Sequence, residues 1–301
     1  MIRAALMLLL LAPWPLMADD RGIVVHPLTS PYQAGATEVR VLLPQPFDAE
    51  KKYRVVYVLP VEAGREARWG DGLREVQQLD LHNKHRLIVV APTFSALPWY
   101  CDHPTDPAMR QESHFVNAVV PLVDRTYPTS SAADDRLLLG FSKSGCGAWS
   151  LMLRHPELFG RASAWDSPLM MQESGKYGSG PIFGTQANFE RYRLADLLRG
   201  RALEWGESNR LVLTGYGNFH DQHQQMHALL DELKIAHDYR DGPRREHTWH
   251  SGWVREAFEL LIAATGPSHG PRAGAKHKGP PATHRRAFVD TQIAKSRPWG
   301  R

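Results

Sequence analysis

Short apolar runs, separated by longer mixed segments, recur through the middle of the chain. The runs are rich in valine, isoleucine and leucine, as in 53–59 and 87–91. Continuous apolar runs of this length are typical of strands that are buried on both faces of a parallel sheet. Strands are therefore predicted at 23–25, 39–43, 53–59, 87–91, 136–139, 162–165, 211–214 and 236–239.

Several of the mixed segments place apolar residues every three or four positions, which is the helical period. Helices are predicted at 72–81, 115–123, 147–154, 191–198, 222–233 and 252–264. Strands that alternate with helices predict an α/β fold, with a mostly parallel sheet and helices on both faces. A long polar segment, 167–207, follows the sixth predicted strand, and an insertion of this length is often a lid or substrate loop.

The two ends of the chain depart from this pattern. Residues 1–18 combine the basic Arg3, a short apolar core and small residues before Asp19, which predicts a signal peptide and a secreted or periplasmic protein. An uncleaved membrane anchor is the alternative, although the apolar run is short for a span. The last segment, 266–301, is rich in Gly, Pro, His, Lys and Arg and is predicted to be disordered. One domain is expected at 19–265.

The high pI of about 9.1 comes from this tail and not from the domain. The tail holds eight of the 36 Lys and Arg residues and one of the 32 acids, so 28 basic and 31 acidic residues lie elsewhere. A slightly acidic domain has no overall basic character to attract nucleic acid. We therefore expect no specific nucleic-acid partner and no membrane span.

The segment around Ser142 has the setting of a hydrolase nucleophile. The apolar run 137–139 leads into Gly140 and then Ser142, and a helix is predicted at 147–154. A serine in a sharp strand–turn–helix connection is held in strained geometry with its hydroxyl exposed, provided that its neighbours are small. Gly140 meets that need, and Ser144 stands where glycine is usual.

A serine nucleophile needs a histidine base. His247 is favoured because it follows the last predicted strand and precedes the final helix, where this fold places its histidine. His250 is the competitor three residues later. His155, at a helix end, is interpreted as a capping or surface residue.

The histidine in turn needs an orienting carboxylate, which usually follows a late strand. Asp221 is the only carboxylate in the loop after 211–214, and it is the predicted acid. Its alternative role is to cap the following helix. Asp166, at the end of the preceding strand, is the alternative acid.

An oxyanion hole requires backbone N–H groups aimed at the developing negative oxygen. The residue after the nucleophile, Lys143, is expected to supply one. The loop after Leu59 is expected to supply the other, from Val61 or Glu62, with Glu62 preferred.

With these residues in place, the chain resembles the secreted esterase branch of the α/β-hydrolase superfamily over about 37–264. That group includes esterase D-like, tributyrin and feruloyl esterases, S-formylglutathione hydrolases and mycolyltransferases. The strand at 57–59 is similar to the family strand that leads into a His-Gly pair, and 98–102 is similar to a Trp-Tyr-x-Asp loop. The helix at 112–127 resembles the one before the elbow, and 247–249 matches a His-x-Trp motif. Asp221 falls where the family acid follows a strand.

Two departures from the family pattern bear on the site. Pro60-Val61 stands in place of His-Gly, in the loop that shapes the oxyanion hole, and Ser144 replaces glycine in the elbow. The resemblance implies an α/β-hydrolase fold and a serine esterase that works through an acyl-enzyme on Ser142. It implies a small-molecule ester as partner and no cofactor. An acyltransferase and a non-catalytic binding protein are the alternatives.

Three further groups of residues carry hypotheses. Trp99 and Tyr100, in a loop after one strand, are predicted to bind substrate, the alternative being that they only pack the loop. Cys101 and Cys146 are the only cysteines, and in an exported chain they could pair as a disulfide or remain thiols. A metal site on His220, His223 and His227 with Asp221 is a further hypothesis, because helical spacing brings such residues together. Without a recognisable metalloenzyme motif, no metal is expected.

Overall fold

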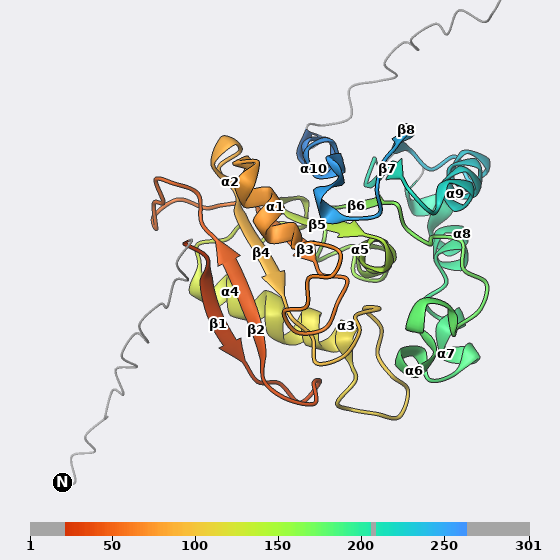
Figure 1. Ribbon diagram of the computed structural model, residues 1–301, viewed down its shortest axis with the longest axis horizontal. Helices are drawn as coiled ribbons and strands as arrows, with labels where there is room; N and C mark the ends of the chain where they lie inside the picture. Colours follow the sequence, from red (N-terminus) through yellow and green to blue (C-terminus); the bar gives the residue numbers. More distant parts are fainter. Residues whose placement is uncertain (1–21, 206–208, 264–301) are drawn as a thin grey trace, which may run out of the picture. The chain divides into compact units, whose positions relative to one another are not determined.

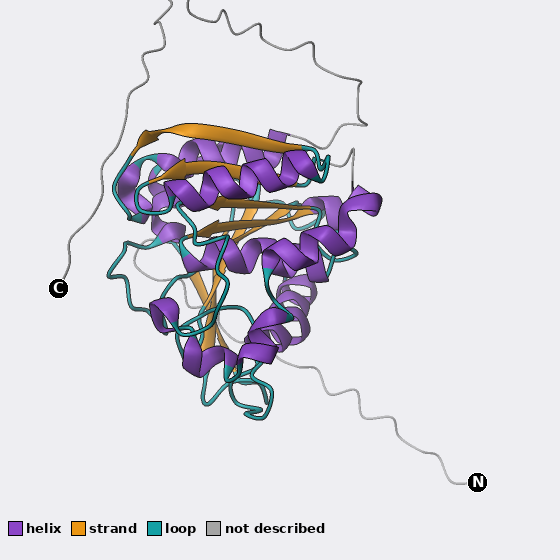
Figure 2. Ribbon diagram, turned by 90° about the vertical axis from the view of Figure 1, so that its right-hand side faces the viewer, coloured by secondary structure: helices purple, strands orange, loops and turns teal. Residues whose placement is uncertain are grey.

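The computed structural model describes residues 22–205 and 209–263, which form a single eight-stranded sheet with helices on both faces (Figures 1 and 2). The strand order is β1-β2-β4-β3-β5-β6-β7-β8. The strands are β1 Val24–Leu28, β2 Thr37–Leu42, β3 Val55–Leu59, β4 Ile88–Pro92, β5 Arg136–Phe141, β6 Arg161–Trp165, β7 Leu211–Tyr216 and β8 His237–Arg244. β2 is antiparallel to both β1 and β4, and all other neighbours are parallel. The expected α/β-hydrolase fold is confirmed.

Two hydrophobic clusters lie on opposite faces of this sheet. The longer helices are α1 Gly72–Gln78, α4 Val120–Thr126, α5 Lys143–Arg154, α8 Leu194–Trp205, α9 His220–Glu232 and α10 Trp253–Ala263. Apolar residues of α4, α5, α8 and α9 pack on one face, and those of α1 and α10 pack on the other. Alternate residues of β3 point to each side: Tyr57 joins the first cluster, and Val56 and Val58 join the second. This double burial explains the continuous apolar runs in the sequence.

Helix boundaries follow local chemistry. Asp71 caps α1 by accepting hydrogen bonds from the N–H groups of Leu73 and Arg74, as an N-cap aspartate does. His155 is the C-cap of α5, which ends before Pro156, so its predicted capping role is confirmed. The helix expected at 115–123 starts earlier: α3 Gln111–His114 continues through a π-helical turn, η1 Phe115–Val119, into α4. The predicted signal peptide at 1–18 and the predicted disordered tail at 266–301 lie outside the described residues.

The long segment between β6 and β7 is partly helical and packs on the domain. It contains η3 Lys176–Gly178, α6 Gly180–Phe183, α7 Gln186–Glu190 and α8. A third apolar cluster joins its Phe183, Phe189 and Tyr192 to Trp99 and Cys101 of the loop after β4. The part of the insertion around α6 and α7 therefore packs on the loop after β4, and its α8 packs on one face of the sheet.

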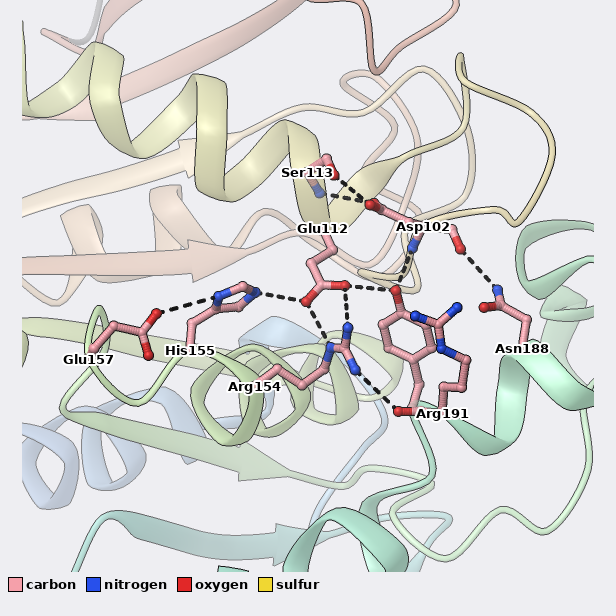
Figure 3. A network of polar contacts seen from close by, with 9 residues as sticks. Asp102, Glu112, Ser113, Arg154, His155, Glu157, Asn188 and Arg191 are labelled. Carbon is pink, nitrogen blue, oxygen red and sulfur yellow. Dashed lines mark hydrogen bonds and ion pairs between the residues drawn. The ribbon is translucent and has the colours of Figure 1, made fainter. Parts of the chain in front are cut away.

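A buried polar network attaches this insertion to the domain (Figure 3). The Glu112 carboxylate on α3 accepts hydrogen bonds from the Arg154 guanidinium at 2.7 and 3.1 Å and from the Tyr192 hydroxyl at 2.7 Å, and it contacts His155 Nε2 at 2.7 Å. Asn188 donates to the carbonyl oxygen of Asp102 at 2.9 Å. Burial favours the neutral acid, but the bonds from His155, Arg154 and Tyr192 outweigh it and lower the pKa of Glu112 to about 2.

We expect Glu112→Gln to lower the free energy of unfolding at pH 7 by about 3 kcal/mol, because it removes a buried carboxylate whose pKa is lowered by its partners and leaves the half-buried Arg154 guanidinium without its charge partner. The pKa of Glu112 is lower in the folded state than its ordinary value of 4.5, so its stabilisation is complete above that value and is lost as pH falls toward 2. Urea unfolding at pH 7 and pH 3 measures this. The difference between wild type and variant should shrink at pH 3, and an equal difference at both would contradict the assignment. Glu157→Gln is the control, since that carboxylate is 71% exposed and lies 3.7 Å from His155.

Candidate active site

Ser142 occupies the sharp turn between β5 and α5. Its φ of 53° and ψ of −130° are strained for a residue with a side chain. The turn is tight at Gly140, where a Cβ would lie only 2.1 Å from the carbonyl oxygen of Ser144. The Ser144 hydroxyl accepts from Phe141 N–H at 2.9 Å and donates to Phe141 O at 2.8 Å. Serine at the usual glycine position thus fits the elbow and closes it with two local hydrogen bonds.

His247 pairs with Asp166 and not with Asp221. The distance from His247 Nδ1 to Asp166 Oδ2 is 2.5 Å. Asp166 is fully buried at the end of β6, and its Oδ1 accepts hydrogen bonds from the backbone N–H groups of Asn218 and Phe219 at 2.8 and 3.0 Å. Burial opposes its ionisation, but the bonds from His247 and these amides hold the pKa of Asp166 below its ordinary value. The carboxylate is thus placed to orient and charge-stabilise the imidazole.

The structure corrects the expectation that Asp221 orients His247. Asp221 lies exposed in the first turn of α9, where a carboxylate favours the helix dipole. The serine–acid–histidine order holds for either aspartate, because both lie between 142 and 247, so the order could not decide between them. The loop after β7 does contribute, but through backbone amides that hold Asp166.

The competing histidines have other partners. His250 Nδ1 lies 2.8 Å from Glu75 Oε2 on α1, and His155 binds Glu112. His247 instead sits in an aromatic setting beside the elbow. Its ring centroid lies 4.5 Å from that of Phe141, the residue before Ser142, and 5.7 Å from that of Phe219.

Trp69, which the sequence did not single out, joins the loop after β3 to the histidine loop. Its ring meets His247 edge-on at 5.2 Å, and its carbonyl oxygen accepts hydrogen bonds from Trp249 N–H at 2.8 Å and the Thr248 hydroxyl at 3.1 Å. No local motif marks Trp69, because its role depends on two loops that meet only in the fold. Its side chain and carbonyl restrict the position of the imidazole.

The two predicted oxyanion donors lie on elements that flank the nucleophile. Lys143 is the first residue of α5, and Glu62 lies in the loop after β3. Neither backbone N–H donates a hydrogen bond to another residue within 22–205 or 209–263. Burial lowers the pKa of the Lys143 ammonium, an effect opposed by the charge of Glu62.

Tyr100 supports the loop after β3. It is fully buried, and its hydroxyl donates to the carbonyl oxygen of Pro60 at 2.6 Å. Its ring packs so closely on α5 that a Cβ at Gly147 would lie 2.1 Å from it. Since no part of Tyr100 is exposed, the expectation that it touches substrate is replaced by the packing role.

Trp99 borders a small apolar cavity of about 30 Å³ under the insertion. The cavity is lined by Trp99 and Cys146 and by residues of the insertion, among them Leu169, Met171 and Phe183. Cys146 lies one helical turn after Ser142, and Leu169 lies three residues after Asp166, the partner of His247, so the cavity is adjacent to the elbow.

Both cysteines are free thiols: Cys101 Sγ lies 3.7 Å from Ile182 O and Cys146 Sγ lies 3.1 Å from Pro168 O. The disulfide alternative is not realised.

The three histidines of the hypothetical metal site on α9 each have a different partner. His220 Nε2 contacts Asp241 at 2.6 Å, and His227 faces β8. His223 is buried, and its Nε2 accepts the Ser167 N–H at 2.8 Å. Burial lowers the pKa of His223 to about 4, so it is a neutral acceptor. Ser167 in turn donates from its hydroxyl to Ser142 O at 2.5 Å, which couples the end of β6 to the elbow.

Comparison with known proteins identifies the family of the chain. The sequence model of a family described as "Putative esterase" matches residues 30–247, most of the chain. The chain therefore belongs to this family of esterases, and it is a carboxylic ester hydrolase. The family and enzyme class expected from the sequence are confirmed. A search of curated proteins gives no match.

Solved structures share the fold at low identity. A ferulic acid esterase is 19% identical with a TM-score of 0.62, and the alignment covers 80% of this chain and 96% of that one. An S-formylglutathione hydrolase from Agrobacterium tumefaciens is 16% identical with a TM-score of 0.62, covering 81% and 95%. A fluorophosphonate-binding serine hydrolase from Staphylococcus aureus is 17% identical with a TM-score of 0.64, covering 79% and 98%. At these identities the likeness shows a common fold.

We expect Tyr100→Phe to lower kcat by roughly 3–10-fold with little change in KM, since loss of the bond to Pro60 O loosens the loop that is expected to carry an oxyanion donor. Tyr57→Phe is the matched control: Tyr57 is also fully buried, and its hydroxyl has no hydrogen-bond partner among the described residues. Steady-state kinetics on a chromogenic ester measures both variants. An equal fall in kcat for the two would attribute the effect to general packing.

Proposed function

We propose that the protein is an exported serine esterase that cleaves its substrate through an acyl-enzyme on Ser142. The observation that carries this is the 2.5 Å contact of His247 with the buried Asp166, beside a serine in a strained strand–helix turn. Family membership supplies the reaction class, and the site supplies residues for each role. Export rests on the signal-like residues 1–18.

His247 acts as general base in this proposal. Its Nδ1–H is held by Asp166, which leaves Nε2 to take the proton of the Ser142 hydroxyl during attack on the ester carbonyl. The backbone N–H groups of Lys143 and Glu62 stabilise the negative oxygen that forms. His247 then returns the proton to the leaving alcohol. In the second half of the reaction, water attacks the acyl-enzyme while His247 takes a proton from it, and His247 gives this proton back to the Ser142 oxygen as the acid leaves. An acyltransferase would differ only in the acceptor that attacks.

The cavity beside Trp99 is the proposed binding site for part of the ester. Its lining is mostly apolar, and its volume of about 30 Å³ leaves little room beyond water-sized groups unless the insertion shifts. A compact acyl group is therefore favoured over a long lipid chain. Trp99 is only 4% exposed and lies 6.1 Å from Phe183 between ring centroids, so it both lines the cavity and stabilises the insertion.

Ser142→Ala should lower ester turnover by several orders of magnitude and leave the fold intact, because it removes only the attacking oxygen. A fluorophosphonate probe should label wild type at Ser142 and fail to label the variant. Intact-mass measurement and hydrolysis of short-chain and aryl esters test the two statements. Undiminished turnover in Ser142→Ala would reject the acyl-enzyme, and a folded wild type that takes no label would favour a binding protein.

Asp166→Asn should lower kcat by roughly 10³–10⁴-fold, because the amide no longer holds the imidazole in the reactive tautomer or stabilises its charged form. Asp221→Asn is the matched control and should stay near wild type, since Asp221 is an exposed residue of α9. Melting temperatures of both variants separate catalytic from structural loss. A greater fall in kcat for Asp221→Asn would restore the acid that the sequence favours.

A further inference from the structure

A cluster of two histidines and an aspartate lies on the side of the domain formed by α9 and the edge strand β8. The His227 Nδ1 atom is 2.7 Å from His237 Nε2, and His227 Nε2 is 3.6 Å from Asp231 Oδ2. One ligand atom from each of the three residues lies within 4.8 Å of the others. None of them takes part in the proposed catalysis.

We propose that His227, Asp231 and His237 bind a divalent transition-metal ion, of which Zn²⁺ is the reference case. Two imidazoles and one carboxylate are a ligand set that suits Zn²⁺, Cu²⁺ or Ni²⁺ and does not suit Mg²⁺ or Ca²⁺, which prefer oxygen alone. Three protein ligands leave a fourth position for water.

The surroundings of His237 fix it in the form that binds a metal. Its Nδ1 lies 2.8 Å from the carbonyl oxygen of Ile235, which can only accept, so the proton resides on Nδ1. The lone pair of Nε2 therefore points at His227. A metal-binding imidazole commonly has its other nitrogen tied in this way to a backbone carbonyl.

His227 is also held in place. Its ring stacks on Tyr239 of β8 with centroids 4.0 Å apart and an interplanar angle of 25°. Asp231 is four residues later on α9, so it projects from the same face of the helix. The Nδ1–H group of His227 donates a hydrogen bond to Nε2 of His237. A metal ion would take the place of this proton between the two nitrogens, and His227 would then carry its proton on Nε2.

The geometry needs only a small adjustment to take the ion. Ligands about 2.0–2.2 Å from a tetrahedral zinc are about 3.3 Å from one another. The two imidazole nitrogens would separate from 2.7 Å by about half an ångström, and the exposed Asp231 side chain would close in. The ion would then tie α9 to the first residue of β8, the edge strand that leads toward His247.

The full-length protein, purified without a histidine tag, should bind one more equivalent of Zn²⁺ than His237→Asn in calorimetric titration. Comparison of variants cancels ions that bind elsewhere on the chain, which has 15 histidines. At a hundredfold excess over Kd, Zn²⁺ should raise the Tm of wild type by about 5 °C and leave that of His237→Asn and His227→Asn unchanged. Circular dichroism confirms that each variant is folded.

Two control variants make the test specific. Asp231→Asn should weaken Zn²⁺ binding about tenfold or more, whereas Glu232→Gln, the exposed neighbour on α9, should not. His220→Gln, which alters a histidine paired with Asp241, should also bind Zn²⁺ as wild type does. Equal zinc stoichiometry in wild type and His237→Asn, or a Tm response that persists in both histidine variants, would overturn the proposal and leave a histidine–histidine hydrogen bond alone.

Discussion

The contact between the buried Asp166 and His247 is the interaction on which the rest of the site depends. A fully buried carboxylate is stable only if its charge is compensated, and here an imidazole and two backbone amides supply that compensation. Those amides come from the loop after β7, the aspartate from the end of β6, and the histidine from the loop after β8. Three adjacent parallel strands are therefore needed to assemble one carboxylate–imidazole contact.

The loop after β3 is held against this centre by packing from two directions. Trp69 contacts the imidazole and binds the histidine loop through its carbonyl oxygen. Tyr100 reaches from the loop after β4 to Pro60 at the start of the same loop. The family's His-Gly pair is absent here, and the backbone position of this loop is set instead by contacts at both ends. Rigid placement matters because a backbone donor stabilises a transition state only when it is already aimed at the charge.

Among residues 22–205 and 209–263, no helix combines the length and apolar character that crossing a bilayer requires.

The insertion between β6 and β7 is attached to the rest of the domain by the Glu112 network and by an apolar cluster that includes Trp99. The covering layer is thus built into the domain by buried charge and aromatic packing. This arrangement ties the shape of the small cavity to the same residues that hold the insertion.

The sequence by itself determined the fold class, the position of nearly every strand and the elbow serine, because these depend on local periodicity and on small residues in a short turn. It also identified His247 by its place after the last strand. Its preference for Asp221 over Asp166 was wrong, because both aspartates follow late strands in the right order. Only the register of β6, β7 and β8 decides which carboxylate reaches the imidazole. Local patterns also could not show that His227 on α9 pairs with His237 of β8, because helical spacing relates only residues of one helix. Nor could they show that Tyr100 is buried, because its ring packs on Gly147, which lies 47 residues later in the chain. Contacts between distant segments are fixed by the packing of whole layers, which no local pattern of residues records.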